Sequence, residues 1–360
     1  MGRYKTGGTH FTHIDKAGTI LTPTVSVILP CYNAEKTLEE TLESLSAQTL
    51  ENFEVLAVDD GSKDSTGLIL DRWRKRDARF KHISQPHRGV VSASNVGMLA
   101  CRAPFIARMD ADDRAHPQRL EKQVAFLKQN LEVAVVSSLV KAFPKADVSG
   151  GFAVYIEWLN SIVTDEEIKR EIFVESPLPN PSVIFRREWL LKMGGYQVHD
   201  NFPEDYDLYL RMYLAGANFA KIPEVLHEWR EHPDRITHTD SRYSLKNFLR
   251  TKAYYLARGP LKERDAVIIW GAGMMGRRLS KWLLREDVPV VAFVDIDPEK
   301  IGRTRRGKPI IAVSALKDVW DSHQAPALLA SVGARGARKL IREKLNELGY
   351  TEGEDWWSAA

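Results

Sequence analysis

The stretch that decides the fold is residues 25–66, which read VSVILPCYNAEKTLEETLESLSAQTLENFEVLAVDDGSKDST. Two short apolar runs, VSVIL and FEVLAVDD, flank a segment with Leu38, Leu42 and Leu45 at helical spacing. A strand, a helix and a second strand in this order predict two parallel strands joined by a crossover helix. Both runs are followed by polar residues, and the carboxyl edge of a parallel sheet is where ligands bind.

The same alternation continues beyond this stretch. Further helices are predicted over residues 64–77 and 91–101, and further strands over residues 80–84 and 105–109. Residues 133–140 are predicted as a strand, 203–216 as a helix, and 218–222 and 224–230 as two short strands. The predicted fold class is therefore α/β, a sandwich around a mostly parallel sheet.

The chain divides into two α/β parts. Residues 1–22 are predicted to be a flexible tail and residues 23–240 the first domain. Residues 241–263 are predicted to be a helical linker, whose amphipathic helix ends at Gly259 and Pro260. The alternation of strands and helices then restarts, and residues 264–360 are predicted to form a second, smaller α/β domain.

Composition limits the classes of partner and compartment. The 360 residues carry a net charge of only +3, so the overall charge predicts no nucleic-acid partner. Only two cysteines are present, which indicates a reducing compartment rather than a disulfide framework. No window approaches 18 consecutive apolar residues, so no transmembrane segment is predicted. We expect a cytoplasmic protein, and a peripheral contact with the inner face of a membrane stays open.

The densest group of acids follows the predicted strand at 105–109, in the stretch FIARMDADD. Asp110, Asp112 and Asp113 would share the carboxyl edge of the sheet with Asp60, Tyr32 and Asn33. Carboxylates that converge without a basic partner need a cation, and oxygen ligands suit Mg²⁺ or Mn²⁺ beside a diphosphate. The alternative is that these acids cap the following helix, and that Asp59 and Asp60 form an Asx turn.

These motifs together resemble the family-2 glycosyltransferases of the GT-A fold. The resemblance rests on residues 25–66, on ARMDADD, and on the later stretches NPSVIFRREWLLKMGGY, PEDYDLYLRMYLAG and VLHEWREH. It covers about residues 23–235, with the pieces in the family's order. One departure is visible, because this chain has Asn180 where related sequences often carry His before Pro-Ser or Pro-Thr. Asn cannot titrate, which puts fine contacts to the sugar or the acceptor in doubt.

The resemblance implies a donor site for a nucleotide-diphospho-sugar, most often a UDP-sugar. The donor-binding residues that it implies are Pro30, Tyr32, Asn33, Glu35, Asp59, Asp60, Arg88, Asn95, Asp110, Asp112, Trp229 and Arg230. Of Asp59 and Asp60, Asp60 is the better candidate for binding the base of the nucleotide, and Asp59 can serve as a turn cap. Asp112 is implied as the main metal ligand, helped by Asp110 or Asp113, and His232 is a further candidate.

The resemblance also implies an inverting transfer to a hydroxyl group of a glycan or lipid-linked acceptor, in cell-surface polysaccharide biosynthesis. A hydroxyl that attacks the sugar must lose its proton, so a carboxylate is required on the acceptor side. Asp205 in PEDYD matches the family's catalytic base, with Glu204 beside it. The alternative is that both acids only favour the start of a helix.

The second domain carries the motif GAGMMG, with Gly271, Gly273 and Gly276 between a predicted strand and a helix. Asp295 follows the next strand, 19 residues after Gly276, near the spacing of an acid that binds a ribose. The domain resembles small Rossmann-like domains found beside sugar-modifying enzymes. Either it binds a nucleotide, or it is a structural or oligomerising module whose tight turn needs glycine. The rival functions are an NAD-dependent sugar oxidoreductase or epimerase, and a catalytically inactive sugar-nucleotide-binding module.

Overall fold

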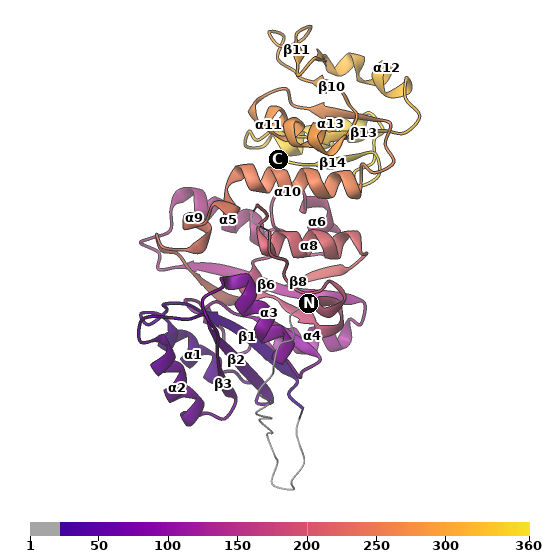
Figure 1. Ribbon diagram of the computed structural model, residues 1–360. Helices are drawn as coiled ribbons and strands as arrows, with labels where there is room; N and C mark the ends of the chain where they lie inside the picture. Colours follow the sequence, from indigo (N-terminus) through magenta and orange to yellow (C-terminus); the bar gives the residue numbers. More distant parts are fainter. Residues whose placement is uncertain (1–21, 200) are drawn as a thin grey trace, which may run out of the picture.

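The computed structural model describes residues 22–199 and 201–360, and Figure 1 shows two α/β units joined by one long helix. Apart from Thr22, the predicted tail lies outside the described residues. The first unit is built on an eight-stranded sheet. In spatial order it contains β3 (Phe80–Ser84), β2 (Phe53–Asp59), β1 (Val25–Cys31), β4 (Phe105–Arg108), β7 (Ile184–Arg186), β6 (Val133–Phe143), β8 (Asn218–Arg230) and β5 (Arg114–Ala115).

Most neighbouring strands of this sheet are parallel. β3, β2, β1 and β4 form one parallel block, and β6 and β8 form a second parallel pair. β7 lies between the two groups and is antiparallel to both neighbours, and β5 is antiparallel to β8. The predicted mostly parallel α/β sandwich is thus confirmed.

Helices pack on the sheet because their apolar residues recur on one side. In α1, Leu38, Leu42 and Leu45 are all buried, as the helical spacing predicts. The helices of this unit are α1 (Leu38–Ser46), α2 (Thr66–Arg76), α3 (Val90–Ala100), α4 (Arg119–Gln129), α5 (Gly150–Asn160), α6 (Asp165–Glu171), α7 (Arg187–Lys192), α8 (Glu204–Leu214) and α9 (Ile236–Thr239), with 3₁₀ turns η1 (Asn180–Ser182) and η2 (Ser241–Tyr243).

One prediction in this unit is wrong, because the two short strands expected at 218–222 and 224–230 are the single strand β8. Ile222 pairs with Ser138 and Val225 pairs with Leu139, so Pro223 and Glu224 bulge out of the ladder. Proline has no N–H to donate, but a bulge needs none at that position, and the strand therefore continues.

The predicted linker contains α10 (Leu245–Arg258), which packs on both units. Its buried residues Leu249, Ala253 and Leu256 share one apolar core with Leu210 of α8 and Leu279 of α11 (Met274–Leu283). The helix is thus an integral part of the packing between the units. The domain boundaries themselves stay a prediction.

The second unit is a smaller α/β domain around a six-stranded sheet. In order, the strands are β11 (Thr304–Arg305), β12 (Lys308–Ile311), β10 (Val290–Val294), β9 (Ala266–Trp270), β13 (Pro326–Ala330) and β14 (Trp356–Ser358). All pairs are parallel except β11 with β12. The remaining helical segments are η3 (Leu284–Glu286), η4 (Val313–Ala315), α12 (Leu316–Asp321) and α13 (Ala337–Glu347).

An ion-pair cluster also joins the two units. The nearly buried Glu171 of α6 lies 2.6 Å from Arg338 Nη1 and 2.9 Å from Arg342 Nη2 of α13. A carboxylate shared by two guanidinium groups is strongly oriented, so these contacts help to hold the second unit against α6.

Candidate active site

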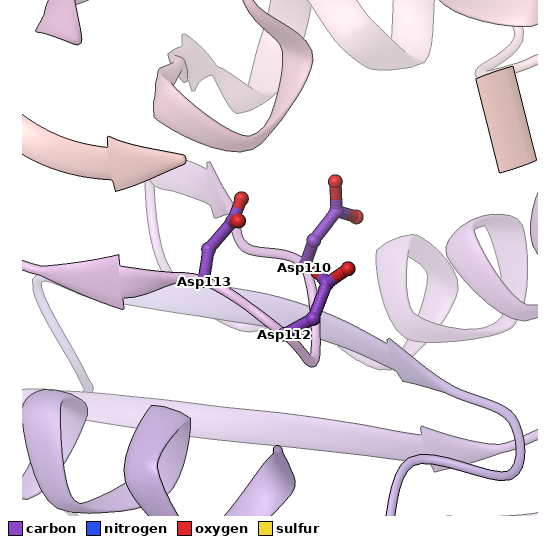
Figure 2. A group of neighbouring side chains, drawn as sticks. All are labelled: Asp110, Asp112 and Asp113. Carbon is purple, nitrogen blue, oxygen red and sulfur yellow. The ribbon is translucent and has the colours of Figure 1, made fainter. Parts of the chain in front are cut away.

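Three aspartates crowd together in the short loop between β4 and β5. Asp110, Asp112 and Asp113 each offer a carboxylate oxygen within 4.8 Å of the others, and Figure 2 shows the three side chains projecting from this one loop. The loop lies at the carboxyl end of β4, where β4 is flanked by β1 and β7. The predicted convergence of these three carboxylates is therefore present in the structure.

Asp113 is the buried member of the group, with 1% of its surface exposed. Its Oδ2 lies 2.8 Å from His227 Nε2, and its Oδ1 accepts the Arg230 N–H at 2.8 Å. Burial and the neighbouring charges of Asp112 and Asp110 raise the pKa of Asp113 well above its usual value. Burial beside two other acids thus makes the charged form of Asp113 costly.

His227 is the neutral donor that supports Asp113. Its Nδ1 lies 3.2 Å from Arg119 Nη1, and a guanidinium can only donate, so Nδ1 is the acceptor. The ring proton is then on Nε2, which donates to Asp113. Burial and the charges of Arg119 and Arg108 hold the pKa of His227 well below its usual value, which keeps the ring neutral.

The other two aspartates are more accessible. Asp110 Oδ1 pairs with Arg108 Nη2 at 2.6 Å, and Asp112 Oδ2 lies 2.9 Å from His232 Nε2. His232 therefore lies beside the cluster, as the sequence predicts for a residue of the metal site. Arg230 Nε donates to the Asp112 carbonyl at 2.6 Å and its guanidinium pairs with Glu40, so Arg230 holds this loop in place.

The donor set fits a divalent cation. Carboxylate oxygens are hard ligands, and the three required oxygens lie close enough together to share one ion. The raised pKa of buried Asp113 is the expected sign of charge that a cation would offset. Asp112 and Asp110 retain exposed side-chain surface through which a ligand can reach them.

The predicted nucleotide side is built on the loops that follow β1 and β2. Tyr32 is 44% exposed, and its ring stacks on that of His87 with centroids 4.1 Å apart. Buried Asp60 accepts the N–H groups of Arg88 at 2.9 Å and Gly89 at 2.8 Å. Its carboxylate also meets the side chains of His87 and Gln85. Three hydrogen bonds thus already reach the Asp60 carboxylate, and His87, whose Nδ1 also lies 3.1 Å from the Asp60 carbonyl, crowds it further, so a nucleotide base that bonds to Asp60 must displace the Gln85 or His87 side chain.

The neighbouring candidates link the two loops to each other. Asn33 has a left-handed backbone, φ 49°, and its Oδ1 accepts the Lys63 N–H at 2.9 Å. Glu35 Oε2 accepts the N–H of Ser65 at 3.0 Å, and Asp59 Oδ1 accepts that of Ser62 at 2.9 Å. Asp59 thus caps the turn after β2, the structural role that the sequence offered for it. Pro30 belongs to β1 itself.

Asn95 is a supporting residue in this structure. Its Nδ2 donates to the Tyr196 carbonyl at 2.7 Å and its Oδ1 accepts the Tyr196 N–H at 3.0 Å, which occupies both ends of the amide. The Tyr196 hydroxyl donates in turn to Asn180 Oδ1 at 2.9 Å, which is also 3.2 Å from the Tyr209 hydroxyl. Arg88 is exposed at the start of the same segment, and its backbone N–H holds Asp60.

The two acids at the start of α8 have different surroundings. Glu204 is buried, and both of its oxygens accept the Tyr243 hydroxyl, at 2.6 and 2.7 Å. Asp205 is partly buried, and its carboxylate accepts the N–H of Tyr206 at 2.7 Å but no hydrogen bond from a side chain of the described residues. Burial and the charge of Glu204 raise the pKa of Asp205 to about 8. Of the two acids, Asp205 is thus the one whose carboxylate can take up a proton without breaking a side-chain hydrogen bond.

The charges of Asp205 on α8 and of Asp110 in the acid cluster both affect the pKa of Tyr196. Tyr196 is buried, and its hydroxyl pKa is raised by burial and by the charges of Asp205, Glu204 and Asp110, while Arg108 lowers it. Charges on two different elements act on one hydroxyl only when both are near it. Tyr196 is therefore within electrostatic reach of both groups of acids, which no local sequence motif indicated.

Trp229 lies in an aromatic group at the end of β8. Its ring is 5.6 Å from that of Phe152 on α5, edge to face, and the Arg235 guanidinium lies 4.5 Å from its centroid. Tyr155 and Trp158 continue the group along α5. The sequence signalled Trp229 but missed the α5 aromatics, because nothing in their spacing distinguishes them from ordinary core residues.

In the second unit, Gly271 and Gly276 serve close packing, whereas Gly273 does not. A Cβ on Gly276 would lie 1.8 Å from the Gly271 carbonyl oxygen, and Gly271 itself has φ 117°. Gly273 is the N-cap of α11, and a Cβ there would meet nothing within 4 Å. Asp295 accepts the Ala272 N–H at 3.0 Å and lies 3.4 Å from Lys300 Nζ, so it holds the glycine-rich turn.

Comparison with known proteins agrees with this architecture. The model of the family Glycosyl transferase family 2 matches residues 26–192, and that of the family C2185-like, N-terminal, matches residues 263–354. Amylovoran biosynthesis glycosyltransferase AmsE of Erwinia amylovora is 32% identical over 59% of this chain and 77% of its own length. The glycosyltransferase EpsJ of Bacillus subtilis is 38% identical over 60% of this chain and 63% of its own.

A solved structure shows the same fold. The crystal structure of S. aureus TarS 1–349 in complex with UDP-GlcNAc aligns with a TM-score of 0.54 at 22% identity, over 73% of this chain and 72% of that one. Together with the site, these relatives define a class: the protein is a sugar-transferring enzyme of the GT-A fold. The chain belongs to glycosyltransferase family 2. In the described part of the chain, every helix is too short or too polar to cross a bilayer.

Proposed function

We propose that the protein is an inverting glycosyltransferase that uses a nucleotide-diphospho-sugar, a UDP-sugar in particular, and transfers the sugar to a hydroxyl of a glycan or lipid-linked acceptor. The observations that carry this proposal are the carboxylate of Asp205, which no side chain of the described residues contacts by a hydrogen bond or ion pair, and the converging carboxylates of Asp110, Asp112 and Asp113. A carboxylate available to take a proton and a group of acids able to hold a cation are the two parts that such a transfer requires.

In the proposed reaction, Asp205 accepts the proton of the acceptor hydroxyl. The hydroxyl oxygen bonds to C1 of the sugar while the bond from C1 to the diphosphate breaks, and the nucleoside diphosphate leaves. Glu204 is held by Tyr243, so its role is to raise the pKa of Asp205 through its charge. A base with a raised pKa takes a proton more readily than an ordinary carboxylate.

Asp112, with Asp110 and Asp113, would hold Mg²⁺ or Mn²⁺ beside the diphosphate, and His232 borders the same place. The bound cation would neutralise the negative charge of the leaving diphosphate. His227 and Arg230 keep Asp113 in position for this role. Tyr32 and Asp60 belong to the proposed nucleotide side, where stacking on the exposed Tyr32 ring is possible without rearranging Asp60.

The biological setting is inferred from relatives. AmsE is named for amylovoran biosynthesis, and another relative, 29% identical over 59% of this chain, is a chondroitin synthase from Escherichia coli. We therefore place this chain in the biosynthesis of a cell-surface polysaccharide. The two cysteines are free and buried, in keeping with the reducing cytoplasm as its compartment.

A donor screen tests this function. The full chain is incubated with UDP-, GDP- and CMP-linked sugars in Mn²⁺ or in EDTA, and binding is followed by thermal melting. We expect stabilisation by one UDP-sugar in Mn²⁺, by about 2.7 kcal/mol at a hundred times its Kd. The same screen includes NAD, and stabilisation by NAD alone, independent of metal, would instead support the oxidoreductase alternative.

A further inference from the structure

A basic cavity lies where α10 meets the second unit. It has a volume of about 540 Å³ and is lined by the start of α10, by one face of α11 and by the turn between β11 and β12. Five of its nine lining residues are cations and none is an acid: Lys246, Arg277, Arg278, Lys281 and Arg306. None of the candidate active-site residues lines it. The cavity is therefore a separate feature of the molecule.

The positive charge of this cavity is not offset from within. Across residues 22–199 and 201–360, none of the five cations forms an ion pair, and all five side chains are exposed. The nearby acid Glu286 is already paired with Arg258 at 2.7 Å. Like charges gathered around one hollow repel one another, so an anion that enters it is favoured.

Arg306 is held toward this cavity by its backbone and by hydrogen bonds. It has a left-handed backbone, φ 51°, in the turn between β11 and β12, which is uncommon for a residue other than glycine. Its guanidinium donates to the Arg277 carbonyl at 3.0 Å and to Ser280 Oγ at 3.1 Å. Both acceptors are neutral, so these bonds orient the charge without compensating it. Arg306 and Gly307, φ 73°, form the two-residue turn of this hairpin, in which positive φ is the ordinary geometry, so the bonds to Arg277 and Ser280 are what fix the guanidinium at the cavity.

The start of α10 adds to the positive potential. Ser244 is the N-cap of α10, but its side chain makes no capping hydrogen bond, and Ser244, Leu245 and Lys246 all line the cavity. The Asn247 and Phe248 N–H groups are bonded to the Ser244 carbonyl, but those of Leu245 and Lys246 have no acceptor within the described residues, and such groups together with the helix dipole attract anions. Trp282 provides an aromatic wall, and the Arg285 guanidinium lies 4.6 Å from the centroid of its ring.

We propose that this cavity binds the phosphate groups of a phosphorylated ligand. Phosphate oxygens match both the forked donors of several arginines and the free N–H groups of a helix start. Trp282 and Leu245 can contact the apolar part of the same ligand. Two sources share this chemistry, namely the headgroups of an anionic lipid surface and a free phosphorylated molecule. The site is distinct from the donor site of the proposed transfer reaction.

The test measures binding of inorganic pyrophosphate to the full chain by calorimetry, in EDTA, so that the acid cluster cannot take part through a cation. Flotation with phosphatidylglycerol vesicles, compared with phosphatidylcholine vesicles, tests the lipid source. The cavity variant is the double substitution Arg278→Glu and Lys281→Glu. The control is Lys75→Glu with Lys128→Glu, which changes the net charge equally at two exposed lysines on α2 and α4.

We expect the cavity variant to bind pyrophosphate, vesicles or both at least about tenfold more weakly, and the control to bind as the wild type does. Loss of pyrophosphate binding alone identifies a free phosphorylated ligand, and loss of phosphatidylglycerol binding identifies a lipid surface. Wild-type protein that binds neither, or a cavity variant that binds as well as the control, overturns the proposal. Both variants should still bind the sugar-nucleotide donor in Mn²⁺, which shows that they are folded. Donor binding also tests the proposed transfer reaction separately from the proposed phosphate site.

Discussion

Both sheets of the protein carry acids at the carboxyl ends of their parallel strands, but the two groups of acids have different surroundings. At the first sheet, Asp110, Asp112 and Asp113 crowd together, and the pKa of Asp113 is raised by burial and by its neighbours. At the second, Asp295 is bonded to the Ala272 N–H and faces Lys300. Parallel topology alone brings acids to this edge. Arg108 pairs with Asp110 at the first sheet, but within the described residues Asp112 and Asp113 form no ion pair with an arginine or lysine, whereas Asp295 is bonded to its own turn and paired with Lys300.

The largest expected effect is that of Asp205→Asn. The substitution removes the acid that has no side-chain partner among the described residues, so transfer should fall by about 1000-fold. The affinity for the donor should change little, because Asp205 lies on the acceptor side in the proposed reaction. Steady-state kinetics and donor titration measure the two effects separately.

Glu204→Gln is the matched control for that substitution. Glutamine can still accept the Tyr243 hydroxyl, so the start of α8 should keep its structure and transfer should fall by less than about tenfold. A Glu204→Gln protein that loses transfer while Asp205→Asn retains it would reverse the roles assigned here to the two acids.

The next largest effect is expected from a pair of substitutions, one at each sheet edge. Asp112→Asn should weaken Mn²⁺-dependent donor binding by about 100-fold, because it removes a carboxylate from the proposed cation site. Asp295→Asn should leave donor binding and transfer within about twofold of wild type, since surface and structural changes remote from a site act mainly on stability. Equal losses in both variants would contradict the division of roles between the sheets.

The effect of pH on kcat/KM should be smaller than the effects of these substitutions, but its direction is defined. With the pKa of Asp205 raised to about 8 by burial and Glu204, the base is protonated below that pH. The value of kcat/KM should therefore rise with pH up to about 8 and fall about tenfold per pH unit below it. A profile that is flat across this range speaks against Asp205 as the base.

The same shift affects the free energy of unfolding. A carboxyl whose pKa is higher in the folded state binds its proton more tightly there, so its contribution to stability is lost as the pH rises from about 4 to about 8. Asp205→Asn should remove this part of the pH dependence. Urea unfolding of the two proteins across that range measures it.

The smallest effect on transfer is expected from the glycine-rich turn. Gly276→Ala places a Cβ 1.8 Å from the Gly271 oxygen and should lower the stability of the second unit by about 1–3 kcal/mol or more. Gly273→Ala meets no atom within 4 Å and should change stability by less than about 0.5 kcal/mol. Thermal melting compares the pair. A loss of transfer in folded Gly273→Ala protein would show that the turn takes part in the reaction.

Much of the fold and of the site could be predicted from local patterns. The spacing of Leu38, Leu42 and Leu45 predicted a buried helix face, and the alternation of strands and helices predicted a parallel sheet. The acid cluster was recognisable because its three members lie in one loop. The division of β8 into two strands was wrong, since only the pairing with β6 reveals that Pro223 lies in a bulge.

By itself, then, the sequence determined the α/β class, the family and the chemical identity of the acids, because these depend on residue type and short-range spacing. Only the tertiary structure decided which groups each acid contacts. The contact of His227 with Asp113 joins residues 114 positions apart, and that of Asn95 with Tyr196 joins residues 101 positions apart. Burial and neighbouring charges then set the pKa of Asp205 and the partners of Glu204, and these are properties of the packed chain rather than of any motif.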